Sequence, residues 1–279
     1  MILTKRWIAP LLLLILAGCT TVAHSDTDDA LRVVSLAPSF TTILLDLDAV
    51  DLIVAADEHS QELILSDGVA TVDMMHPEIE QLVSLNPDVI FVSELTLVDL
   101  SHLETFDIRV YQLPTPQQIS DISVELLFIG EIVDRDTQAQ ALVTQFEQAL
   151  TELQARVPDR DAPLTVYFEI MPAPHLFSFG QDVFLDELLK KAGLQNIFHD
   201  ATGWFPVDAE RVVDANPDII LTNVDFIPDA ISDIMNRDGW QSVRAIENHR
   251  VYFVANNYTS RPTHHLTWAL EMIIEAIYE

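Results

Sequence analysis

Residues 119–157 read ISDISVELLFIGEIVDRDTQAQALVTQFEQALTELQARV, and this stretch decides how the rest of the chain is arranged. Apolar residues recur in it at the spacing of an amphipathic helix, and no proline interrupts it before Pro158. The polar triplet 134–136 is typical of a helix end followed by a new N-cap, so we predict helices over about 117–133 and about 136–156. The first would span about 25 Å.

A repeated unit flanks these helices on both sides. One copy reads Glu80-QLVSLNPDVIFV, and the other reads Glu210-RVVDANPDIILT. The second copy lies 130 residues after the first both at the glutamates and at Asp88 and Asp218. Because proline disfavours the helical conformation in the residue before it, each copy predicts a helix that carries the Glu, ends at Asn-Pro and precedes a buried strand. Such a unit is common in α/β proteins, but the matched glutamates favour a duplication.

The amino-terminal end has the features of a lipoprotein signal peptide. Residues 1–18 combine a basic start with an apolar stretch that is too short to span a bilayer. The sequence LAGC at 16–19 resembles the bacterial lipobox, in which the cysteine, here Cys19, is lipidated. Cys19 is the only cysteine, so no intramolecular disulfide forms. We expect a flexible tether over 19–31. The alternative is an ordinary secretory signal whose cysteine is incidental.

The chain is strongly acidic, with 44 acidic residues, 14 basic residues and a net charge of −30. This balance excludes nucleic acid as a partner and disfavours direct adhesion to anionic lipid, so we expect membrane attachment by a lipid anchor only. The acidic excess fits either a saline habitat or a need for solubility.

Strand and helix signals alternate on both sides of the central stretch. This pattern predicts an α/β fold with two lobes, each a parallel-rich sheet flanked by helices. We place the N-terminal lobe at 32–116, a single long bridging helix at 117–135 and the C-terminal lobe at 136–279. The last strand is expected from Val251, before a final helix of about 263–278.

Several motifs together resemble one protein family. The opening Arg32-VVSLAPSFTTILLDL, the pattern Glu80-x-x-x-x-L-x-P-D, the helical bridge, the turn at Gly180 and the block Trp204…Glu210…Asn-Pro-Asp follow the family order. The family comprises periplasmic substrate-binding proteins of ABC importers for iron–siderophores, haem and cobalamin, the helical-backbone class III. The resemblance covers nearly the whole chain after residue 31. One departure is Thr42, where the family motif has Glu.

The resemblance implies two Rossmann-like lobes that hold a ligand in the cleft between them and close little, because the bridge is a helix. It implies a monomer in the cell envelope, on the periplasmic or extracytoplasmic face, without catalytic residues, bound metal or cofactor. It also implies that Glu80 and Glu210 dock onto arginines of an ABC permease dimer. Taken singly, each Glu has a simpler explanation as part of a solvated helix face.

Ligand contacts are expected in the loops after the carboxyl ends of the strands, where open α/β sheets bind their ligands. Residues of the types of Phe40 and Tyr167 more often belong to the core. His264 and His265 are adjacent and would point in different directions on a helix, so only one of them is expected to face the cleft. The candidate ligand-binding residues are Ser39, Phe40, Glu58, His59, Met75, Tyr167, Trp204, Tyr258, Arg261 and His264.

These candidates favour a ferric siderophore, a bulky chelate read by aromatic faces and a few Arg or His donors. Cobalamin, which needs apolar and aromatic walls, or haem comes second. Haem needs an axial ligand, and Met75 resembles one such position, but Asp225 stands where haem-binding relatives offer His. A bare metal ion at Glu58, His59 and His76 lacks diagnostic spacing. A metal-dependent envelope hydrolase and an envelope scaffold are the alternatives of another class.

Overall fold

The computed structural model describes residues 30–64 and 68–279, so the predicted signal peptide and Cys19 lie outside the described residues. The N-terminal lobe is built on a five-stranded sheet in the order β3-β2-β1-β4-β5, and every neighbouring pair is parallel. The strands are β1 (Val33–Leu36), β2 (Ile53–Asp57), β3 (Ala70–Val72), β4 (Val89–Ser93) and β5 (Arg109–Leu113), and helices α1 (Pro38–Asp46) and α2 (Ile79–Ser84) follow β1 and β3.

The C-terminal lobe has a second parallel sheet of four strands in the order β11-β10-β6-β8. A separate antiparallel pair, β7 with β9, lies outside this sheet. The strands are β6 (Leu164–Glu169), β7 (Phe177–Phe179), β8 (Leu194–Asn196), β9 (Trp204–Pro206), β10 (Ile219–Thr222) and β11 (Val251–Phe253). The helices are α5 (Phe184–Lys191), α6 (Ala209–Ala215), α7 (Ala230–Met235), α8 (Arg244–Glu247), α9 (Asn256–Thr259) and α10 (Leu266–Tyr278). The predicted α/β fold with two parallel-rich, helix-flanked sheets is confirmed.

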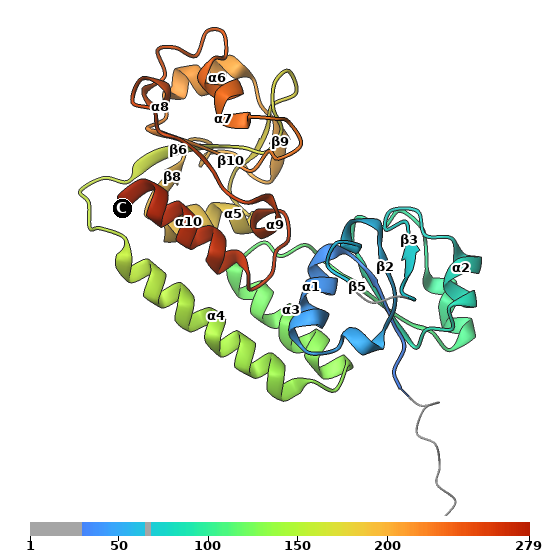
Figure 1. Cartoon of the computed structure of the whole chain (residues 1–279). Coiled ribbons are helices and arrows are strands. Elements are labelled where there is room, and N and C mark those ends of the chain that lie inside the picture. Colours follow the sequence, from blue (N-terminus) through green and yellow to red (C-terminus); the bar gives the residue numbers. More distant parts are fainter. Residues whose placement is uncertain (1–29, 65–67) are drawn as a thin grey trace, which may run out of the picture. The chain divides into compact units, whose positions relative to one another are not determined.

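Helices α3 (Ile119–Ile132) and α4 (Asp136–Arg156) connect the two sheets (Figure 1). The start of α3, at Ile119 and Ile122, packs into the core of the C-terminal lobe, whereas its second half packs against the core of the N-terminal lobe. Helix α4 also contacts both cores, in the opposite order along the chain. Ala139, near its start, packs into the core of the N-terminal lobe, and Phe146 packs into the core of the C-terminal lobe. The bridge is therefore a pair of helices, although the sequence reading assigned this role to α3 alone and placed α4 wholly in the C-terminal lobe.

The repeated unit folds in the same way in both lobes. Asn86 and Asn216 both adopt the left-handed conformation, with φ of 48° and 47°, which ends α2 and α6 before the following proline. Asp88 Oδ2 then accepts the backbone N–H of Arg32 at 2.7 Å, and Asp218 Oδ2 accepts that of Thr165 at 2.9 Å. Each Asp therefore ties its helix–strand junction to the start of the neighbouring strand.

Across 30–64 and 68–279, every helix is either too short or too polar to cross a bilayer.

Candidate ligand-binding cleft

A pocket of about 150 Å³ lies where the two lobes meet. The N-terminal lobe contributes the start of α1 and the loops at the carboxyl ends of β4 and β5, and the C-terminal lobe contributes 260–262. Helix α3 contributes Glu125 to the wall. A second hollow of about 560 Å³ shares 113–116 and Glu125 and extends along α3 to Phe128. The carboxyl ends of parallel strands are where open α/β sheets bind ligands.

Three predicted residues line this pocket. Ser39 and Phe40 belong to the first turn of α1, and Arg261 belongs to the loop after α9. Phe40 is also a core residue, since it packs against Phe91 with the ring centroids 6.3 Å apart. Arg261 Nη2 donates a long hydrogen bond of 3.5 Å to the carbonyl oxygen of His59, so this side chain reaches the opposite lobe.

Glu58 and His59, which begin the turn after β2, adjoin the same region. The carboxylate of Glu58 accepts the backbone N–H of Met74 at 3.1 Å, and Met74 lines the pocket. His59 Nε2 lies 3.7 Å from Glu58 Oε1, and both side chains remain exposed. His76 Nδ1 instead lies 3.9 Å from Asp73 Oδ1. The metal site of Glu58, His59 and His76 that the sequence suggested therefore does not form among the described residues.

Exposed apolar side chains mark the carboxyl ends of both sheets. In the N-terminal lobe they are Met75, Leu95 and Leu97, in the loops after β3 and β4. In the C-terminal lobe they are Met171, Phe226 and Phe253, which follow or end β6, β10 and β11. Trp204 is exposed too, but it begins β9, which lies outside this sheet. Trp204 is 42% exposed although its ring also packs on Phe179, 5.5 Å away. Apolar side chains exposed at these strand ends offer surface that an organic ligand entering the pocket could contact.

Tyr167 is a correction to the prediction. Its side chain is fully buried, with T-shaped contacts to Phe198 at 6.0 Å and to Trp240 at 5.9 Å. It therefore has no surface to offer a ligand. The neighbouring Glu169 is also structural, because Arg237 binds both of its oxygens, at 2.6 and 2.9 Å, in a buried pair that joins the end of β6 to the segment after α7.

Tyr258 and His264 lie away from the pocket lining. The Tyr258 ring packs edge-on against Trp268, at 4.9 Å. The Nε2 atoms of His264 and His265 lie 3.1 and 2.9 Å from the same oxygen, Oδ2 of Asp46, at the end of α1. Only one of the two histidines was expected to face the cleft; both instead contact Asp46, and neither lines the pocket. Burial acts to raise the pKa of Asp46, but the two histidine hydrogen bonds outweigh it and hold that pKa well below its usual range.

Glu125 is a site residue that the sequence reading missed. Its side chain is 8% exposed, and its Oε1 atom has no hydrogen-bond partner among the described residues. Burial, together with the nearby charge of Asp121, raises the pKa of Glu125 to about 8. The sequence could have indicated this residue, because helical spacing places Glu125 on the same face as Ile122 and Ile129, which is buried. Burying a carboxylate on such a face costs free energy, so a glutamate there is unusual.

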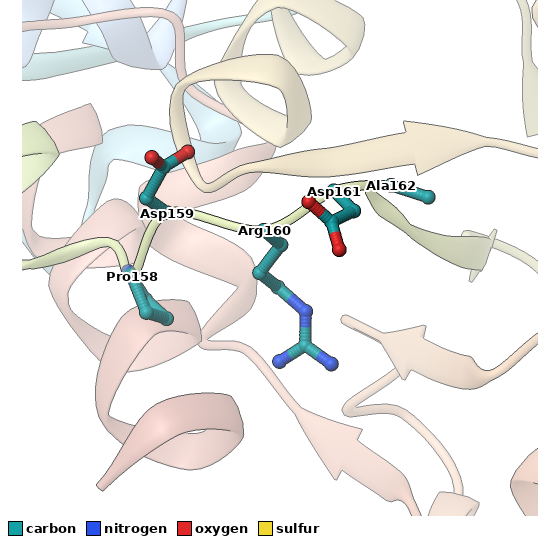
Figure 2. Close-up of a pocket in the computed structure, with 5 residues that line it drawn as sticks. All are labelled: Pro158, Asp159, Arg160, Asp161 and Ala162. Atoms are coloured by element: carbon teal, nitrogen blue, oxygen red, sulfur yellow. The ribbon is translucent and has the colours of Figure 1, made fainter.

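Another hollow lies elsewhere and lacks the features of a site. It measures about 520 Å³ and is lined by the loop 158–162 between α4 and β6. Figure 2 shows Asp159 and Arg160 pointing to opposite sides of this loop, so their charged groups do not converge on one point. All five residues are exposed. We therefore place the candidate site between the lobes.

Comparison with known proteins identifies the family. A model of the periplasmic binding protein family matches residues 33–258. The chain belongs to this family. It is 29% identical over 256 residues to an uncharacterized ABC transporter substrate-binding lipoprotein, YvrC, of Bacillus subtilis (strain 168), covering 88% of this chain and 80% of that protein. The vitamin B12-binding protein of Vibrio cholerae is 24% identical over 249 residues, covering 87% of each chain.

A solved structure supports the same assignment. A possible iron-binding (periplasmic solute-binding) protein from Staphylococcus epidermidis matches with a TM-score of 0.76 and 26% identity, covering 89% of this chain and 98% of that one. The family resemblance inferred from the sequence motifs is thereby confirmed.

In this periplasmic binding protein, the two glutamates of the repeat occupy equivalent places. Glu80 lies in the first turn of α2, and Glu210 lies in the first turn of α6. Both side chains are exposed, and neither has an ion-pair partner within the described part of the chain. Both carboxylates therefore face solvent.

Proposed function

We propose that this protein is the substrate-binding component of an ABC importer and captures an iron–siderophore-type chelate between its lobes. The observation that carries the proposal is the pairing of a pocket between the lobes with exposed apolar side chains at the carboxyl ends of both sheets. A metal chelate of this class presents organic faces and partial charges, which suit aromatic and aliphatic walls with a cation such as Arg261. The similarity to a possible iron-binding protein supports the same ligand class.

Cobalamin is the second candidate, and haem follows it. The similarity to a vitamin B12-binding protein favours cobalamin, and so does the hollow of about 560 Å³ along α3, whose wall includes Val124 and Phe128. Haem would need an axial ligand. Met75 is 41% exposed and could supply a sulfur, but Asp225 occupies the place of the second ligand expected from the resemblance.

The proposal includes export and anchoring. We infer that Cys19 carries a lipid that holds the chain at the extracytoplasmic face of a membrane. The support is the lipobox-like sequence at 16–19 and the similarity to a protein described as a lipoprotein. A polar tether over 19–31 would leave the ligand-binding lobes free to reach a permease.

A ligand screen tests the capture step. The purified protein is mixed with a ferric hydroxamate, a ferric catecholate, haemin or cyanocobalamin, and its melting temperature and Trp fluorescence are measured. A ligand at 100 times its dissociation constant stabilises the folded state by about 2.7 kcal/mol. We expect a ferric chelate to raise the melting temperature and to quench Trp204, and the iron-free siderophore to act more weakly. Stabilisation by cyanocobalamin alone would select the second candidate, and hydrolysis of a probe would contradict a purely binding role.

A second experiment tests delivery to the permease. We infer that Glu80 and Glu210 dock onto basic residues of a two-subunit permease, one per lobe. An exposed ion pair contributes about 0–1 kcal/mol, and more when it is desolvated in an interface. We expect the double change Glu80→Ala and Glu210→Ala to abolish uptake in cells while ligand affinity stays within about twofold of the parent protein.

The matched control is Glu104→Ala with Glu147→Ala, which removes the same charge from two other exposed positions. This control should transport normally. Equal loss of uptake in both double variants would show that overall charge matters rather than these two positions. Normal uptake by the Glu80/Glu210 variant would rule out the docking role.

A further inference from the structure

We propose that Asp46, His264 and His265 form a binding site for a divalent transition-metal ion, with Zn²⁺ as the preferred ion, that ties α1 to the start of α10. Asp46 is the last residue of α1 in the N-terminal lobe, and the two histidines directly precede α10 in the C-terminal lobe. Figure 1 shows the start of α10 approaching α1 from the other lobe. The site is separate from the pocket at Ser39 and Arg261.

The ligand atoms already converge. The two histidine Nε2 atoms lie 3.1 and 2.9 Å from Asp46 Oδ2, and all three potential ligand atoms lie within 4.8 Å of one another. In a four-coordinate zinc site with bonds of about 2.0–2.1 Å, neighbouring ligand atoms stand about 3.3 Å apart. Binding would therefore require each nitrogen to move a few tenths of an ångström away from the carboxylate oxygen. Because the three atoms lie within 4.8 Å of one another, the two nitrogens would also have to approach each other by up to about 1.5 Å, through rotation of the side chains.

The side chains are held in place by their neighbours. The His265 ring stacks on Trp268 at 4.0 Å with an interplanar angle of 18°, and the His264 ring packs edge-on against His265 at 4.6 Å. The His264 side chain is 11% exposed, while Asp46 remains 33% exposed. The group is therefore fixed on one side and open to water on the other, which leaves room for a solvent molecule as a fourth ligand.

The chemistry of the three groups selects the ion. Two imidazole nitrogens and one carboxylate oxygen suit Zn²⁺ and related first-row ions, whereas Mg²⁺ and Ca²⁺ prefer oxygen ligands alone. With the histidines neutral, the group carries one negative charge, and the whole chain carries −30, so a divalent cation is electrostatically favoured.

The hydrogen-bonded arrangement leaves one polar atom without a partner. His264 Nδ1 is buried and has no hydrogen-bond partner among the described residues. Neither neutral tautomer of His264 can satisfy both ring nitrogens here, so the contact with Asp46 does not complete the bonding of this side chain. A cation bound at Nε2 would replace the shared carboxylate contact and fix the spacing of the two lobes at this point, but it would leave Nδ1 without a partner, so the proposal depends on the convergence of the three ligand atoms and not on this nitrogen.

Metal titration of the purified, EDTA-treated protein tests the proposal. We expect one Zn²⁺ per chain by calorimetry, with a rise in melting temperature, and visible absorption bands of four-coordinate Co²⁺ when cobalt replaces zinc. Asp46→Asn and His265→Gln should each weaken Zn²⁺ binding at least tenfold and abolish the cobalt bands. The double change His102→Gln and His175→Gln removes two other exposed histidines that lie outside the group, and it should leave Zn²⁺ binding unchanged.

The result that overturns the proposal is the absence of Zn²⁺ binding, or binding that survives Asp46→Asn or is lost in the His102/His175 control. If Asp46→Asn reduces folding, as judged by circular dichroism, His264→Gln provides the second variant and carries the same expectation. The outcome is independent of the chelate and permease experiments, because it concerns a different part of the molecule.

Discussion

Glu125 is the residue whose environment departs most from what its chemistry prefers. The carboxyl group is buried on α3 and lacks a partner at Oε1 in the described chain. Its pKa is raised from 4.5 to about 8, so the folded chain retains a proton that the unfolded chain releases between these pH values. As pH rises from about 4.5 to about 8, the unfolded state is therefore stabilised relative to the folded state, and the free energy of unfolding of the wild type falls.

The change Glu125→Gln should remove this pH dependence, because Gln has nearly the same shape and no acidic proton. At pH 7 we expect the variant to be more stable than the wild type by about 3 kcal/mol, with a much smaller difference near pH 4.5. Urea unfolding at a series of pH values measures this. Glu131→Gln, at an exposed position of the same helix, serves as the control and should follow the wild type. Parallel stability curves for wild type and Glu125→Gln would contradict the buried, protonated state.

At the residue scale, the sequence predicted positions better than contacts. The sequence correctly placed Ser39, Phe40 and Arg261 at the pocket. The order of elements along the chain shows which residues come after a strand, so these positions could be predicted without knowing any contact. Tyr167 lies in a strand that is buried on both faces, so the alternation of side chains could not tell core from cleft. His264 and His265 precede α10 rather than lying within it, and the helical rule that sends neighbours in different directions did not apply.

At the element scale, the contact between α3 and α4 depends on Gly130. A side-chain carbon at Gly130 would collide with Cβ of Ala139, so the glycine permits the close approach of the two bridging helices. Alanine is the better helix former by about 1 kcal/mol, yet overpacking typically costs about 1–3 kcal/mol. Because the collision is severe, we expect a cost near the upper end of the difference, so Gly130→Ala should destabilise the chain by up to about 2 kcal/mol, measured by urea unfolding.

A double-mutant cycle isolates the contact between these helices. Adding Ala139→Gly to Gly130→Ala moves the methyl group from one helix to the other and relieves the collision. The double variant should be more stable than the sum of the single changes predicts, by about 1 kcal/mol or more. Strict additivity would show that the two positions do not constrain each other.

The elements themselves were largely predictable from local signals. The helix spanning 136–156 was predicted with its observed bounds, and the Asn-Pro pairs ended both repeat helices as expected. The pairing of β7 with β9 was not foreseen, since it joins segments far apart in the sequence and depends on the finished fold. The sharing of α4 between both lobes was missed for a similar reason, because periodicity shows that a helix has an apolar face but not which core that face meets.

At the scale of the whole molecule, the duplication places the two exposed glutamates at equivalent positions of the two lobes. A single Glu in the first turn of a helix is an ordinary surface residue. Here the same helix, turn and strand recur 130 residues apart, and the same Asp-to-backbone hydrogen bond fixes each copy. Each carboxylate is thereby positioned by the rigid part of its own lobe. In the proposed docking role, a partner that contacts both glutamates would contact both lobes.

The net charge of −30 should make stability depend on ionic strength. Like charges repel one another in the folded state more than in the expanded unfolded state, and salt weakens that repulsion. The Debye length falls from about 30 Å at 0.01 M to about 8 Å at 0.15 M salt, so most of the relief should occur within this range. We expect the melting temperature to rise by at least about 2–4 °C, the shift that 1 kcal/mol produces in a chain of this size.

Differential scanning calorimetry in 0.01–0.2 M NaCl measures this rise, and choline chloride should match NaCl because screening depends on ionic strength rather than on the identity of the cation. Sucrose over the same concentrations provides an uncharged control. A further rise confined to molar NaCl would instead indicate exclusion of salt from the protein surface, as expected of a protein adapted to brine. A melting temperature that stays constant between 0.01 and 0.2 M would mean that the acidic residues are spaced widely enough for their repulsion to be negligible.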